Sequence, residues 1–102
     1  MIYHVTKKAA WEEARLMGFY EAPSLATEGF IHNSTSEQVR PVLERYYKNE
    51  TDLLLLHIEE SLLTAPLKYE LAPSVNEMFP HIFGPINLQA VVEVQEIDLT
   101  SF

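Results

Sequence analysis

The stretch Asp52-Leu53-Leu54-Leu55-Leu56-His57-Ile58-Glu59 decides the fold of this chain. Its interior is apolar at successive positions, so neither face of a strand built from it is suited to water. The leucine run is also far too short to cross a bilayer. We therefore predict that residues 52–59 form a strand inside a sheet that is covered on both faces. His57 follows the leucines near the end of this strand, and we interpret it as structural.

On the N-terminal side, the sequence predicts a strand followed by a helix. Residues 2–5 predict a strand that ends at Thr6, whose side chain can cap a helix running to Gly18. Residues 20–27 contain a proline and a serine and predict an irregular surface segment, whereas residues 29–32 predict either a short strand or an extended approach to the next helix. The expected buried face of the helix carries Ala10, Trp11, Ala14 and Met17.

A second helix is predicted before the leucine strand. Ser34 and Glu37 have the spacing of a capping box. Because Pro41 interrupts the pattern that follows, we expect a short turn at residues 36–39 and a helix from there to about Tyr47. The apolar stripe of this helix consists of Val39, Val42, Leu43, Tyr46 and Tyr47.

The C-terminal half predicts strands and one long loop. Residues 67–71 alternate between apolar and polar side chains, as a half-buried strand does, and residues 88–99 predict the closing strand. Residues 73–85 contain three prolines and predict a long loop of the kind that is often functional. Helices early and strands late predict an α+β fold. The expected core includes Trp11, Phe30, Tyr46 and Leu55.

Composition limits the classes of function. A chain of 102 residues with 47% hydrophobic content has room for one domain with a substantial core. There is no cysteine and no signal-peptide pattern, so we expect a cytoplasmic protein. The net charge is −8 and the seven basic residues are scattered, which disfavours nucleic acid as a partner. We expect no membrane association, and a monomer or a weak dimer.

Besides His57, the other three histidines also lie among apolar residues. The stretches Glu28-Gly29-Phe30-Ile31-His32-Asn33-Ser34 and Phe79-Pro80-His81-Ile82-Phe83-Gly84 each place one histidine near a glycine that allows a tight turn, and His4 lies in the first strand. Buried imidazoles need partners for their ring nitrogens. Each histidine alone is best explained as a core residue. The three together predict a shared concave pocket lined by His4, His32 and His81.

These motifs resemble one known family, the bacterial and plant domain-of-unknown-function family 952, over nearly the whole chain. The resemblance is carried by Tyr3-His4-Val5-Thr6, the Trp11 helix, Ser24-Leu25, the stretch from Glu28 to Ser34, Gln38, Tyr69-Glu70 and the stretch from Phe79 to Gly84. Asn33 and Phe83 stand where other residues are more usual, tyrosine often at the latter position. The resemblance implies an ADP-ribosyltransferase-like fold. In such a fold a split, bent sheet of antiparallel or mixed strands encloses a nicotinamide-dinucleotide cleft, with two main helices early in the chain.

The resemblance implies this cleft, so we expect NAD as the small molecule that is bound, and we expect no metal. The expected function is an NAD-dependent ADP-ribosyl-type transferase or a related NAD-processing enzyme. Cleavage of the nicotinamide–ribose bond passes through an oxocarbenium-like state, which needs an oriented ribose, a wall for the ring and a nearby carboxylate. The catalytic candidates are His4, His32, His81 and Glu70. The ligand-binding candidates are Tyr3, Thr6, Glu28, Phe30, Ser34 and Phe83, with phosphate expected at the helix start beside Ser34.

Two alternatives stay open at this stage. One is a non-catalytic module that binds a nucleotide or another small molecule in the same pocket. The other is a hydrolase with a zinc ion held by His4, His32 and His81, because three histidines and an open position suit hydrolytic zinc. No two of these histidines have the local spacing of metal ligands, so the zinc alternative depends on tertiary geometry.

Overall fold

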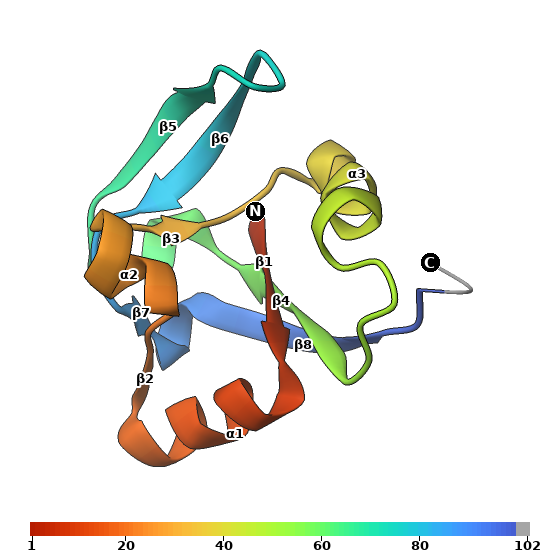
Figure 1. Cartoon of the computed structure of the whole chain (residues 1–102). Helices are drawn as coiled ribbons and strands as arrows, with labels where there is room; N and C mark the ends of the chain where they lie inside the picture. Colours follow the sequence, from red (N-terminus) through yellow and green to blue (C-terminus); the bar gives the residue numbers. More distant parts are fainter. Residues whose placement is uncertain (100–102) are drawn as a thin grey trace.

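The leucine run forms β4 (Leu53–Ile58), the middle strand of an antiparallel sheet in the order β1-β4-β8. The computed structural model describes residues 1–99 and confirms an α+β fold (Figure 1). The other elements are β1 (Ile2–Lys7), α1 (Lys8–Met17), β2 (Phe19–Tyr20), α2 (Pro23–Glu28), β3 (Ile31–His32), α3 (Ser36–Tyr46), β5 (Leu67–Ala72), β6 (Glu77–Ile82), β7 (Ile86–Asn87) and β8 (Val91–Ile97), with single 3-10 turns at Glu60–Leu62 and Leu88–Ala90.

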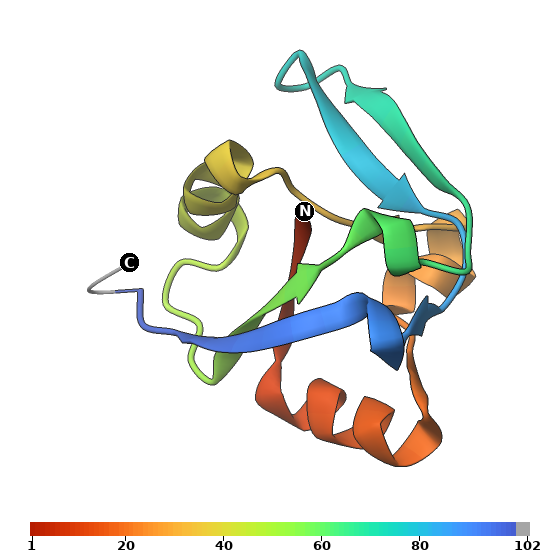
Figure 2. The same cartoon turned by 180° about the vertical axis from the view of Figure 1, so that it is seen from behind.

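Both faces of β4 are covered, as its sequence predicts. Leu54 and Leu56 belong to one core, which includes Trp11 and Ala14 of α1. Leu53 and Leu55 belong to a second core on the opposite face, which includes buried residues of α3. Successive side chains of a strand point to opposite faces, so four consecutive leucines supply two cores at once. Figure 2 shows β4 and β8 from behind, with α1 and α3 on opposite sides of the sheet.

A second sheet, in the order β3-β6-β5, carries the candidate site. Its β5–β6 hairpin projects away from the main sheet (Figure 1). The prediction of a long loop at residues 73–85 is wrong, because residues 77–82 form β6 and pair with β5 along its whole length. Pro80 lies inside β6, where its carbonyl accepts a hydrogen bond from Asn33 N just beyond the end of β3. Pro80 has no N–H to donate. Because β3 ends at His32, no hydrogen bond between β3 and β6 is lost at this position.

The first two helices begin at other residues than the sequence predicts. Thr6 does not cap α1, since β1 extends through Lys7 and the helix starts at Lys8. Gly18 ends α1 with a φ of 90°, as predicted for a left-handed C-cap. The segment expected to be irregular contains β2 and the six-residue helix α2, which has its proline at the first turn. A proline is accommodated there because the first N–H groups of a helix need no intrahelical partner.

The helix α3 also differs from the prediction. Its capping box joins Thr35 and Gln38, one residue later than the predicted pair of Ser34 and Glu37. The helix is continuous through Pro41 and is not preceded by a separate turn. Of the predicted stripe, Val39 and Leu43 are buried, whereas Tyr46 is 62% exposed and is not part of the core. The expected face of α1 is likewise reduced to Trp11 and Ala14, because Ala10 and Met17 are exposed.

In the part of the chain that the structure describes, we find no helix of the length and apolar character that a membrane span requires. The short pair β2 and β7 connects the N-terminal helices to the C-terminal strand. Tyr20 of β2 is buried, and its hydroxyl lies within hydrogen-bond distance of His4 and Thr6 of β1.

Candidate functional site

The predicted shared pocket is present. A cavity of about 790 Å³ lies between β1, β3, α3 and the end of the β5–β6 hairpin, and His4, His32 and His81 all line it. This volume is within the range of small-molecule sites in proteins, about 300–1,000 Å³. Tyr3, Thr6 and Ser34 also line the cavity, whereas Glu28, Phe30, Glu70 and Phe83 are absent from its lining. The predicted site residues therefore divide into a group at the cavity and a group behind it.

Two of the histidines are direct neighbours across two strands. His32 of β3 pairs with His81 of β6, and paired residues of antiparallel strands point to the same face. Their ring centroids lie 5.2 Å apart with an edge-on arrangement. The side chain of His32 is 55% exposed, whereas that of His81 is 10% exposed. His32 therefore lies at the exposed rim of the cavity, and His81 lies at an enclosed part of its wall.

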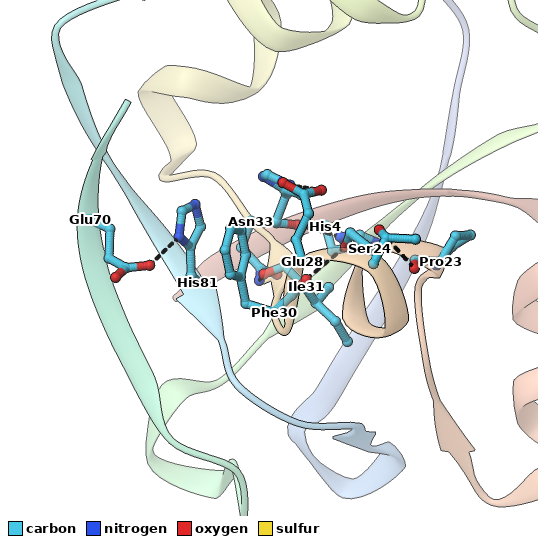
Figure 3. A network of polar contacts seen from close by, with 11 residues as sticks. His4, Pro23, Ser24, Glu28, Phe30, Ile31, Asn33, Glu70 and His81 are labelled. Atoms are coloured by element: carbon cyan, nitrogen blue, oxygen red, sulfur yellow. Dashed lines mark hydrogen bonds and ion pairs between the residues drawn. The ribbon is translucent and has the colours of Figure 1, made fainter. Parts of the chain in front are cut away.

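Each of these two histidines contacts a carboxylate. His81 Nδ1 lies 2.7 Å from Glu70 Oε1, and His32 Nε2 lies 3.0 Å from Glu28 Oε2. Glu70 is two residues from Lys68, the direct partner of His81, so the contact is a diagonal one on a single face of the sheet. Figure 3 shows Glu70 reaching His81 from the neighbouring strand. A carboxylate on one ring nitrogen sets the tautomer and leaves the other nitrogen for chemistry.

Phe30 holds the two imidazoles from behind the cavity. Its ring stacks on His81 with centroids 4.0 Å apart and an interplanar angle of 10°, and it meets His32 edge-on at 4.9 Å. Phe83 lies on the far side of Phe30, with 5.5 Å between the ring centroids, and Lys68 Nζ lies over Phe83. Figure 3 shows Phe30 alongside His81. Phe30 therefore contacts both histidines directly, Phe83 contacts Phe30, and neither phenylalanine lines the cavity.

His4 is held in a buried chain of hydrogen bonds. Its Nδ1 lies 2.6 Å from the carbonyl oxygen of His32, and its Nε2 lies 2.8 Å from the hydroxyl of Tyr20. The Tyr20 hydroxyl also lies 2.9 Å from Thr6 Oγ1. A carbonyl only accepts, so Nδ1 of His4 carries the proton and donates it.

Burial lowers the pKa of His4 to about 4, so the ring is neutral at pH 7 and its Nε2 accepts from Tyr20. Thr6 then donates its own proton to the phenol oxygen. Both ring nitrogens of His4 are thereby occupied within the protein. These hydrogen bonds hold the main chain of β3 in place at His32. His4 is therefore a positioning residue.

The outer edge of β1 is open inside the cavity. Tyr3 exchanges two main-chain hydrogen bonds of 2.8 Å with Ser34 on that edge. Main-chain groups of a strand alternate in direction, so the N–H and C=O of Val5 point to the same side as those of Tyr3. Within residues 1–99, neither group of Val5 has a hydrogen-bond partner, and Val5 lines the cavity. A donor and an acceptor of the main chain are thus available side by side.

Sequence reasoning missed several residues of this site. Tyr20, Asn33, Phe79 and Tyr47 line the cavity in addition to the predicted side chains. Asn33 Nδ2 donates to the carbonyl of Ile31, while the buried Oδ1 has no hydrogen-bond partner within the described chain. Such a buried acceptor costs about 1–3 kcal/mol when it is unsatisfied. The Tyr20 contact with His4 has no signal in the sequence, because it depends on how β2 packs beside β1.

The alternative of a three-histidine zinc site does not fit this geometry. Residues 1–99 contain no group of three histidine, aspartate or glutamate side chains that is placed to hold a metal ion. His4 has no ring nitrogen left for a ligand, since His32 and Tyr20 occupy both. The remaining pair, His32 and His81, offers fewer side chains than zinc sites use.

Comparisons with known proteins give one family model and similar solved structures. A family model described as "Protein of unknown function (DUF952)" matches residues 5–94. The X-ray crystal structure of protein CC0527 from Caulobacter crescentus is 28% identical in sequence and has a TM-score of 0.86, over 95% of this chain and 85% of that chain. The solution NMR structure of CC0527 gives a TM-score of 0.82 over 95% and 84%. No curated protein matches significantly. Because the family model covers most of the sequence, the chain belongs to the DUF952 family.

Proposed function

We propose that the cavity binds a nicotinamide-type substrate, and that the protein is an NAD-dependent ADP-ribosyl-type transferase or a related NAD-processing enzyme with an ADP-ribosyltransferase-like split sheet. The observation that carries the proposal is the open main-chain edge of Val5 within an aromatic cavity. A primary carboxamide has one acceptor and two donors, so it complements the N–H and C=O of a single strand residue. A flat ring attached to it meets aromatic side chains, among them Tyr3 and Phe79.

The His81–Glu70 pair supplies a base for such a substrate. In cleavage, the bond between ribose C1′ and the pyridinium nitrogen breaks, and its electron pair stays on nitrogen, which neutralises the ring. A water or an acceptor hydroxyl adds to C1′ and gives up its proton. His81 Nε2 takes this proton while Nδ1–H stays bonded to Glu70, so the new imidazolium is paired with a carboxylate. This pathway assigns His81 as the base and Glu70 as the residue that orients it.

The other predicted residues take supporting roles in this proposal. Ser34 lines the cavity next to the open edge, where its hydroxyl is placed to bind a ribose hydroxyl. His32 stands at the rim and is oriented by Glu28 and Phe30. His4 and Thr6 act through the position of β3, because the hydrogen-bond chain that joins them ends at the His32 carbonyl.

The experiment is a titration of the ¹⁵N-labelled protein with nicotinamide, with nicotinate as the matched ligand. Nicotinate has the same ring but a carboxylate in place of the amide, so it cannot donate to the Val5 carbonyl. We expect the amide resonance of Val5 to shift with nicotinamide at millimolar concentration and to shift much less with nicotinate. The amide of Val94 on β8, at the other edge of the main sheet, is the internal control. Equal shifts at Val5 with both ligands, or none with either, would refute the proposal.

Catalysis is tested separately from binding. The full chain is incubated with the oxidised dinucleotide, and the release of free nicotinamide is measured by chromatography. We expect release that His81→Gln abolishes, because glutamine keeps a polar side chain but takes up no proton. Binding at Val5 without any release of nicotinamide would instead identify a non-catalytic nucleotide-binding module.

A further inference from the structure

The cavity offers no free positive charge to a ligand. All seven basic residues of the chain lie in the described part, and Lys7 alone lines the cavity. Its Nζ is paired with Glu50 Oε1 at 2.7 Å and donates to the carbonyl of Thr51 at 2.9 Å. Two of the other basic residues form ion pairs, Lys8 with Glu96 and Arg15 with Glu12. Two lie over aromatic rings, Arg45 over Tyr46 and Lys68 over Phe83. The last two, Arg40 and Lys48, line a separate cavity.

Negative charge and acceptor atoms surround the same cavity. Glu21 lines it, and Glu28 and Glu70 stand directly behind the two histidines of its wall. The Val5 carbonyl is open on the edge of β1, and Oδ1 of the lining residue Asn33 is an acceptor without a partner in residues 1–99. The whole chain carries a net charge of −8, so its long-range field also repels anions.

The start of α3 does not make up for the missing cations. Helix N-termini bind phosphate through free N–H groups and the helix dipole. Here the capping box of Thr35 and Gln38 occupies the main-chain N–H groups of these two residues, and the same turn carries the carboxylate of Glu37, which repels an anion. Ser34, which we expected to cap this helix beside a phosphate, bonds instead through its main chain to Tyr3. A diphosphate would therefore enter a site with acceptors and carboxylates, whose one lining cation, Lys7, is already paired with Glu50.

On the basis of the proposed nicotinamide site, we infer that, among nicotinamide-type substrates, a positively charged pyridinium nucleoside without phosphate groups binds more tightly than the dinucleotide. The positive ring is attracted by the aromatic wall and by the carboxylates around the cavity. The sugar hydroxyls are donors for the carboxylate of Glu21 and the hydroxyl of Ser34, two residues that line the cavity. Cleavage with water would release free ribose and neutral nicotinamide, and the proton from water would pass to His81 Nε2.

The test compares three probes on the full-length protein at equal ionic strength: nicotinamide riboside, nicotinamide mononucleotide and the oxidised dinucleotide. Binding is followed by the Val5 amide shift and the rate of nicotinamide release. We expect the riboside to bind at least about tenfold more tightly than either phosphorylated probe, because each phosphate must approach uncompensated carboxylates. Equal or tighter binding of the dinucleotide would overturn this inference and leave the nicotinamide proposal standing. No Val5 shift with any probe would overturn both.

A charge reversal sharpens the comparison. Glu21→Lys places a cation at the cavity wall, and Glu13→Lys makes the same change of net charge on the exposed side of α1. We expect Glu21→Lys to narrow the preference for the riboside over the mononucleotide by about threefold or more, whereas Glu13→Lys changes it much less. Equal effects of the two variants would show that only net charge matters, which would refute a substrate preference set by the cavity.

Discussion

His81 Nδ1 donates a hydrogen bond to Glu70 Oε1 across 2.7 Å, from the middle strand of the second sheet to its edge strand. The carboxylate only accepts when ionised, so the proton of the neutral imidazole lies on Nδ1. The Nε2 atom then carries the free electron pair, on a ring that lines the cavity and is stacked on Phe30. The contacts with Glu70 and Phe30 therefore fix the position and the tautomer of the His81 ring. Glu70 is also the ion-pair partner of this ring when it is protonated.

The first prediction concerns Glu70→Gln. The amide keeps a hydrogen-bond acceptor for Nδ1 but removes the charge that stabilises the imidazolium. We expect kcat for nicotinamide release to fall by about 10- to 100-fold with a much smaller rise in KM, since Glu70 acts on His81 from outside the cavity wall and is one of several carboxylates near the cavity. Glu13→Gln, at an exposed position of α1, is the control and should retain activity. A loss confined to KM would assign Glu70 to binding instead.

The second prediction is a loss of stability in mild acid caused by His4. The pKa of this ring is lowered from 6.5 to about 4 in the folded protein, so the unfolded chain takes up the proton first as the pH falls. Stability from this residue is complete above about pH 6.5 and is lost progressively down to about pH 4, by about 3 kcal/mol in total. Urea unfolding at a series of pH values measures it.

His4→Gln is the matched variant for this acid effect. It should be less stable at pH 7 but should lose less stability between pH 7 and pH 5 than the parent protein does. His57→Gln removes a different, half-buried imidazole from the same sheet, so the acid sensitivity due to His4 should remain. If the parent and His4→Gln curves run parallel over this range, His4 is not the titrating group.

The third prediction concerns the hydroxyl of Tyr20. Tyr20→Phe leaves His4 Nε2 buried without its donor, and we expect a cost of about 1–3 kcal/mol in the free energy of unfolding. Tyr46→Phe removes a hydroxyl from an exposed ring and should change stability by less than about 0.5 kcal/mol. Because Thr6 bonds to the same hydroxyl, Tyr20→Phe and Thr6→Val should be less than additive. Strict additivity would contradict the hydrogen-bond chain.

The fourth prediction separates packing from function. Leu55→Ala removes a side chain that is 3% exposed in the core beneath α3 and should cost about 2–5 kcal/mol. His32→Ala removes a side chain that is about half exposed at the cavity rim, so it should cost less than about 1 kcal/mol and weaken ligand binding. Thermal unfolding and the Val5 titration measure the two effects. Unfolding of His32→Ala at the level of Leu55→Ala would make His32 a structural residue.

The sequence predicts those features that depend on local periodicity. The leucine run predicts β4 and its two covered faces because consecutive apolar residues put apolar side chains on both faces of a strand. Gly18 predicts the end of α1 because a left-handed residue costs glycine little. The histidine motifs predict the shared pocket, since buried imidazoles in three segments need partners and tend to meet.

Local rules failed where a neighbour in space changed their outcome. Pro80 predicts a loop, yet it lies in β6 because its strand neighbour β3 ends at that point. Tyr46 completes an apolar stripe, yet it faces the cavity because the second core is filled by Val39 and Leu43. In both cases the local residue pattern predicts one structure. The outcome is decided by a segment that packs against the residue and lies elsewhere in the chain.

By itself, the sequence determined the middle strand, the α+β class and the meeting of His4, His32 and His81. The tertiary structure alone decided which atoms of the site are free. It placed Tyr20 on His4 and Glu70 on His81, and it left the edge of β1 open at Val5. The physical reason is that burial and periodicity are encoded in neighbouring residues, whereas a hydrogen-bond partner is chosen by the pairing and register of strands far apart in the chain.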